Sequence, residues 1–168
     1  MFKLSRCACL LTCLAVALSP SMPACAAGKN LVAGTWIMVS AQANPDGENK
    51  PLFGPHPNGL LIFTEDLHFA DVLTNPDVPK FASSNRAKGT DAENKAVVAR
   101  DLALYGTYTV DEQGNFATEH VIASMFPNWN GLDRDTRTIT ETVEGDTMTE
   151  RLQDPGGPLI VIVWKRAM

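Results

Sequence analysis

The sequence predicts an all-β fold: a single antiparallel β-barrel of about eight strands, with one short helix between the third and fourth strands. Short runs rich in β-branched and aromatic residues recur along the chain, and turns rich in Gly, Pro, Asn and Asp separate them. The first and last of these runs, residues 31–42 and 159–166, are strand-like. Pairing them would close the sheet and remove its free edges.

The N-terminus has the pattern of a secretory signal. Two basic residues precede an apolar run over residues 10–18, and Ala24-Cys25-Ala26 offers the small-x-small pattern of a cleavage site. We therefore expect residues 1–26 to be removed, leaving a barrel domain over 27–168 that is exported, either periplasmic or secreted. The apolar run is too short to span a bilayer. A lipid anchor at Cys25 is the less favoured alternative.

Composition excludes several functional classes. All four cysteines lie in the leader, so the mature chain should have no disulfide, thiolate nucleophile or cysteine-based metal site. The formal net charge is −5, and the 14 Lys and Arg residues form no basic stripe, so nucleic acid is not an expected partner. The three histidines have no paired metal-ligand spacing, and no phosphate or cofactor motif occurs, so neither metal nor cofactor is expected.

After the first strand, Asn44-Pro-Asp-Gly47 predicts a turn, and the Pro- and Gly-rich segment up to residue 59 predicts a loop over one barrel end. Residues 59–64 and 67–73 read as a hairpin. The remaining strands are expected in a meander over residues 107–110, 116–126, 137–143, 147–153 and 159–166.

One helix is expected between these groups of strands. Thr90 and Glu93 form the pattern of a capping box. Val98, Leu102 and Tyr105 recur at helical spacing and would lay one face of the helix on the barrel, with Gly106 ending it or starting the next strand.

Several segments resemble a known family. Gly34-Thr35-Trp36 resembles the Gly-x-Trp signature of lipocalins, in which the Trp plugs the closed barrel end and a late basic residue lies against it; here Lys165 or Arg166 would take that place. Together with Gly106–Asp111, His120, Ser124–Gly131 and Val163–Arg166, the pattern is similar to the lipocalin-like domain family of bacteria and fungi. The resemblance implies a cavity for a hydrophobic small molecule, and Gly34, Trp36 and Arg166 as structural signature residues.

One position departs from the family pattern. Asp71 stands between Phe69 and Leu73, on a parity that should be apolar. Either the strand register differs or the barrel holds an unusual carboxylate. Because Asp is mostly exposed in proteins, a solvated position outside the barrel is the favoured expectation.

The strand over residues 116–126 supplies the main ligand-binding candidates. Alternation puts one set of aromatic, apolar and hydrogen-bonding groups on one face, a mixture suited to an orienting pocket: Phe116, Thr118, His120, Ile122, Ser124 and Phe126. His120 would be the proton donor or acceptor if this face lines the cavity. Asp71 could then orient its ring across the barrel, as carboxylates do in acid–base pairs. The favoured alternative is a His120 that only fixes the sheet.

Three further residues are candidates for ligand contact. Arg137 could bind a carboxylate bidentately, although a surface position is favoured. Tyr108 is a polar candidate whose favoured alternative is packing within the barrel. Trp129 could close the cavity mouth or cover the core.

The functional hypothesis is an exported protein that binds a small apolar molecule, with His120, Ser124, Phe126, Trp129, Tyr108 and Arg137 as ligand-binding candidates. The alternative is a cofactor-independent isomerase or cyclase in which His120 moves a proton and Asp71 supports it. The sequence leaves open whether the protein is an enzyme. A lipidated Cys25 would instead indicate an envelope-associated interaction protein.

Overall fold

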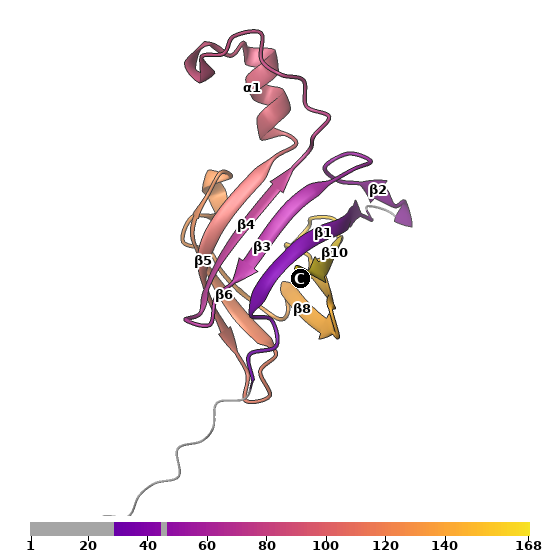
Figure 1. Ribbon diagram of the computed structural model, residues 1–168, viewed down its shortest axis with the longest axis vertical. Helices are drawn as coiled ribbons and strands as arrows, with labels where there is room; N and C mark the ends of the chain where they lie inside the picture. Colours follow the sequence, from indigo (N-terminus) through magenta and orange to yellow (C-terminus); the bar gives the residue numbers. More distant parts are fainter. Residues whose placement is uncertain (1–28, 45–46) are drawn as a thin grey trace, which may run out of the picture.

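The computed structural model describes residues 29–44 and 47–168 (Figure 1). The predicted leader over residues 1–26, Cys25 within it, and the centre of the predicted turn at Pro45 and Asp46 lie outside the described residues. In the described part of the chain, no helix is long and apolar enough to cross a membrane.

The structure confirms an all-β antiparallel barrel. The sheet has ten strands rather than about eight, because β2 and β7, only two and three residues long, were not predicted. The strands are β1 (Gly34–Ala43), β2 (Lys50–Pro51), β3 (Asn58–Phe63), β4 (His68–Thr74), β5 (Leu102–Val110), β6 (Phe116–Ser124), β7 (Asp133–Asp135), β8 (Ile139–Glu144), β9 (Thr147–Leu152) and β10 (Ile160–Arg166).

The first and last long strands pair, as the sequence predicted. β1 lies antiparallel to β10 on one side and to β3 on the other. The sheet order is β7-β6-β5-β4-β3-β1-β10-β9-β8, with β2 paired to the end of β1. β7 and β8 end this path and do not pair with each other, so the barrel is nearly closed (Figure 1).

The helix is shorter than expected. Its capping box is present, with the Thr90 N–H donating to Glu93 at 2.7 Å and the Glu93 N–H donating to the Thr90 hydroxyl at 3.3 Å. However, α1 covers only Asp91–Val98, and Leu102 already pairs with β4 as the first residue of β5. The expectation that a helix face lies on the barrel is wrong: α1 buries no residue and stands beyond one barrel end (Figure 1).

The end of the barrel near the start of β1 is closed by an anchored Trp. Trp36 is completely buried and its indole N–H donates to the carbonyl of Val32 at 2.8 Å. The Arg166 guanidinium lies 4.0 Å from the centre of the Trp36 ring and donates to the carbonyls of Ala33 and Leu31. Of the two basic residues considered, it is therefore Arg166 that lies against the Trp.

Aromatic rings fill the interior beside this plug. The Phe63 ring lies 4.8 Å from the ring of Tyr108, 6.1 Å from Phe69 and 6.3 Å from Phe116. The Tyr108 hydroxyl donates to the carbonyl of Thr64 at 2.7 Å. Aromatic side chains thus fill this end of the barrel.

Candidate functional site

A layer of ionisable side chains crosses the middle of the barrel. It consists of four carboxylic acids and one guanidinium, contributed by β4, β6, β7, β8 and β9. Their side chains are almost fully buried, at 4–7% exposure: Asp71, Glu119, Arg134, Glu141 and Glu150. Buried charges in proteins are normally paired one to one, whereas here acids outnumber the only base in the layer. We refer to these five residues as the acid layer.

Strand alternation explains why three of the acids face inward. In β4, β8 and β9 each acid lies two residues from apolar neighbours that point into the core, so it shares their face. These triplets are Phe69, Asp71 and Leu73; Ile139, Glu141 and Val143; and Met148, Glu150 and Leu152. The expectation that Asp71 lies outside the barrel is wrong, and the alternative of an unusual interior carboxylate is the one observed.

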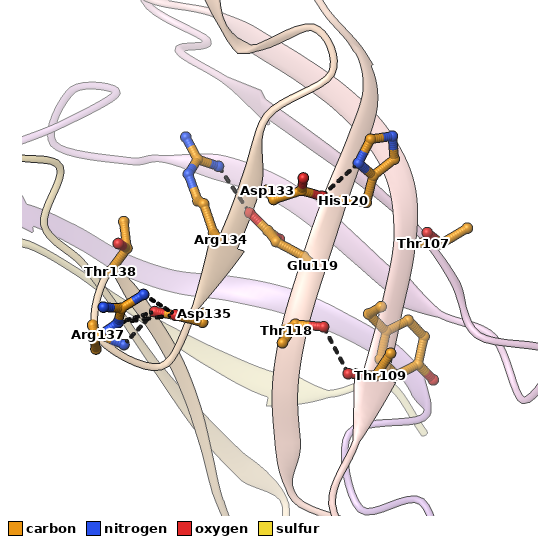
Figure 2. Close-up of a pocket in the computed structure, with 11 residues that line it drawn as sticks. Thr107, Thr109, Thr118, Glu119, His120, Asp133, Arg134, Asp135, Arg137 and Thr138 are labelled. Atoms are coloured by element: carbon orange, nitrogen blue, oxygen red, sulfur yellow. Dashed lines mark hydrogen bonds and ion pairs between the residues drawn. The ribbon is translucent and has the colours of Figure 1, made fainter.

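Glu119 and Arg134 form the one direct ion pair of the acid layer (Figure 2). The Arg134 Nη1 donates to Glu119 Oε1 at 2.8 Å, and the guanidinium lies 4.2 Å from the centre of the Trp129 ring. Asp154 approaches its Nε at 3.7 Å. Burial raises the pKa of Glu119, although the hydrogen bond and charge of Arg134 act in the opposite direction.

Glu141 and Glu150 face each other directly across β8 and β9. Two ionised carboxylates in such a cross-strand position repel each other. Burial, together with the charges of Glu150 and Glu119, raises the pKa of Glu141 well above its usual range. Burial and the charge of Glu119 raise the pKa of Glu150 to about 7, although its Oε2 accepts a hydrogen bond from the Trp164 indole at 3.1 Å.

Asp71 approaches this pair from the other side of the barrel. Burial first, and then the charges of Glu150 and Glu119, raise its pKa well above the usual range. Its Oδ1 is buried without a hydrogen-bond partner, as are Glu141 Oε2 and the Nε and Nη2 atoms of Arg134. The layer therefore presents hydrogen-bonding capacity that the described protein atoms do not use.

A small cavity of about 60 Å³ adjoins the acid layer. Asp71, Arg134 and Glu150 supply its polar wall, and the rest is apolar: Leu52, Phe53, Leu73, Leu102, Leu104, Trp129, Ile139, Leu152, Ile160 and Ile162. Typical ligand pockets measure roughly 300–1,000 Å³. The cavity as it stands would therefore accommodate only a small polar head.

The mouth of this cavity is covered by side chains that are only partly buried, among them Leu52, Phe53 and Trp129. Phe53 has a left-handed backbone with φ of 57°, which side-chain-bearing residues adopt at some cost, and Gly54 follows with φ of 81°. The cover of the cavity thus consists of Leu52 and Phe53, in a loop whose backbone is strained at Phe53, and of Trp129 in the short 3-10 helix η3 (Pro127–Trp129). Trp129 lines this cavity and also packs against the core.

His120 does not face this cavity. An irregularity near Ala117 inserts one extra residue into β6 opposite β5, so that Glu119 and Val121 point inward while Thr118 and His120 point outward. The expectation that His120 shares the interior face is therefore wrong. Its Nδ1 lies 2.7 Å from Oδ1 of Asp133 rather than near Asp71, and the two side chains are 47% and 84% exposed (Figure 2).

Of the other predicted ligand contacts, Tyr108 and Arg137 line an open pocket of about 460 Å³ together with His120 (Figure 2), whereas Ser124 and Phe126 do not. Ser124 and Phe126 lie at and beyond the end of β6, where the Ser124 hydroxyl accepts a hydrogen bond from the Phe126 N–H. Arg137 is exposed and holds Asp135 through two nitrogens. Tyr108 packs at the closed end, where burial raises its pKa. Of the predicted set, the cavity wall includes only Trp129 and the catalytic candidate Asp71.

Sequence reasoning missed Glu119, Arg134, Glu141 and Glu150. A signal existed for two of them, since Glu141 and Glu150 stand on the apolar parity of their strands, the same anomaly that drew attention to Asp71. Glu119 could not be found this way because the irregularity in β6 reverses its parity. Within the described residues, no three His, Cys, Asp or Glu side chains are arranged to hold a metal ion.

The sheet order and the plugged end define an antiparallel β-barrel that encloses a small interior cavity. The chain matches the profile of the lipocalin-like domain over residues 33–167, and it therefore belongs to that family. No curated protein matches the sequence. Among solved structures, the chain is similar to a de novo designed fluorescence-activating β-barrel, with 14% identity, a TM-score of 0.41, and coverage of 82% of this chain and 94% of the designed one.

Proposed function

We propose that this chain is an exported binding protein that holds a small molecule with an apolar body inside the barrel. The observation that carries the proposal is the cavity itself, where apolar side chains surround three buried ionisable groups, two of which, Asp71 and Arg134, have unused hydrogen-bonding atoms. Burial of apolar ligand surface would drive binding at about 25 cal/mol per Å² before the costs of association. The acid layer would orient the polar end.

The volume of the cavity adds a condition to this proposal. A ligand larger than a few water-sized groups must displace part of the cover formed by Leu52, Phe53 and Trp129. We therefore expect association to be limited by opening of the cover, which is slower than diffusional encounter. Replacing Phe53 by Ala should speed association by removing the largest side chain at the strained tip.

The isomerase or cyclase alternative is not favoured. It required His120 in the cavity with Asp71 beside it, and the structure places His120 on the outer surface with Asp133. An outer pair of this kind is open to water on both side chains, so it lacks the enclosure that proton transfer to a buried ligand needs.

The proposal is tested by native mass spectrometry of the protein purified from its host, followed by release and identification of any bound molecule. A co-purifying compound should be absent from Leu102→Trp, which fills the cavity, and retained by Ile122→Trp, an equal enlargement on the outer face. Circular dichroism checks that both variants fold. Retention of the compound by folded Leu102→Trp would refute an interior site.

A further inference from the structure

We infer that the ligand of this cavity is an amine, whose protonated nitrogen lies beside Asp71 and Glu150 and whose apolar body extends toward the mouth. The inference rests on the proposed function and specifies the chemical class of its ligand. It follows from three features of the acid layer: its excess of acids, its unpartnered oxygens and the position of its one base.

The acid layer has fewer cations than acids. Its single guanidinium, on Arg134, is already hydrogen-bonded to Glu119 and is approached by Asp154. No other base belongs to the layer, so Asp71, Glu141 and Glu150 have no counter-ion of their own. In a low-dielectric interior a positive charge would be attracted to any ionised carboxylate of this group far more strongly than in water.

The layer also has a place for a hydrogen-bond donor. Asp71 Oδ1 and Glu141 Oε2 are buried oxygens without a partner, and Asp71 and Glu150 both line the cavity. An ammonium group carries up to three donors and no acceptor. In the cavity it would therefore supply both hydrogen bonds and positive charge to the carboxyl oxygens of Asp71 and Glu150, whereas a neutral hydroxyl would supply no charge.

A carboxylate ligand fits the layer less well. Nη2 of Arg134 is unpartnered and could donate a hydrogen bond to one anionic oxygen. However, that anion would lie beside Asp71 and Glu150 in the cavity wall, and like charges in an apolar interior exclude each other unless one is protonated. Binding of a carboxylate ligand would therefore require an ionised acid of the layer to take up a proton.

Binding of an amine should release a proton. Asp71 on β4, Arg134 on β7 and Glu150 on β9 line the site, and Glu119 on β6, Glu141 on β8 and Asp154 beside Arg134 complete the charged groups around it. Burial raises the pKa of Asp71 and Glu141 well above the usual range and that of Glu150 to about 7, so Glu150 is partly protonated near neutral pH. When R–NH₃⁺ enters, one carboxylic O–H bond breaks, the carboxylate stays with the ammonium, and the proton leaves to solvent. Net charge in the interior is unchanged by this exchange.

The test is isothermal titration calorimetry of the purified protein with n-octylamine, 1-octanol and octanoate, in two buffers of different ionisation enthalpy. We expect the amine to bind at least about tenfold tighter than the alcohol and to release up to one proton near neutral pH. Glu150→Gln and Asp71→Asn should lose this preference while still binding the alcohol. Asp133→Asn, which removes an exposed acid on the outer face, should behave as the wild type.

The outcomes separate the two proposals. Tighter binding of the alcohol or of octanoate, or amine binding without proton release, would overturn the amine assignment and leave the binding function intact. Failure of all three probes to bind would refute the proposed function itself. Equal loss of amine affinity in Asp133→Asn would place the amine site on the outer face and would also overturn the assignment.

Discussion

Replacing Glu150 by Gln should make the stability of the barrel less dependent on pH. Glu150 has an ordinary pKa of 4.5 when unfolded, and burial raises it to about 7 in the fold. Between these values the folded protein binds a proton that the unfolded chain has lost, so stability falls as pH rises. One unit of pKa corresponds to about 1.4 kcal/mol. The loss attributable to Glu150 is therefore about 3 kcal/mol, nearly complete once the pH passes 7.

The assay is urea unfolding followed by Trp fluorescence at about pH 5 and about pH 8, on opposite sides of that window. The wild type should lose about 3 kcal/mol more than Glu150→Gln on going from the lower to the higher pH. Glu112→Gln, which neutralises an exposed acid in a turn, should follow the wild type. An unchanged pH dependence in Glu150→Gln would show that this carboxyl ionises as freely in the fold as in water, and would refute the description of a desolvated acid layer.

Three further predictions concern stability. Arg134→Met leaves Glu119 buried without its partner and should cost about 3 kcal/mol in urea unfolding, much of it restored by adding Glu119→Gln; no restoration would contradict a specific pair. Arg166→Ala removes the cation over Trp36 and two hydrogen bonds to backbone carbonyls, so calorimetry should show a loss of about 2 kcal/mol. Gly106→Ala would place a Cβ 1.9 Å from a backbone carbonyl oxygen of β6, and thermal unfolding should reveal a cost of about 3 kcal/mol; wild-type stability would contradict this close approach.

The barrel could be predicted from the sequence because its long strands obey local rules. The hairpin of β3 and β4 and the pairing of β1 with β10 follow from alternating residues and turn signals that act over a few positions. The predicted helix extends beyond the observed one for a related reason. Leu102 and Tyr105 satisfy helical spacing, but the backbone pairing of β5 with β4 outweighs that weak local preference.

The site could be predicted only in part because it depends on where the parity of a strand changes. One extra residue near Ala117 reverses which side chains of β6 face the cavity, and nothing in the residue types there distinguishes the two registers. It moves His120 to the surface and brings Glu119 to Arg134. Assembly of the acid layer further requires β4, β8 and β9 to meet across the barrel, which is a property of the closed sheet and not of any strand alone.

The acid layer is costly for a protein that must rest on its core. The domain it occupies has no cysteine, since all four lie within residues 1–26, and therefore no disulfide to offset a weakened interior. Apolar residues in place of a buried ionic cluster are often neutral or stabilising, so packing alone gives no reason for three unpaired acids at positions where neighbouring strands carry Leu, Ile and Met. A ligand that brings the missing positive charge would supply that reason, because its binding energy is added to the folded state alone. The empty barrel is then the less stable form, and occupancy and stability are linked through the same carboxyl groups.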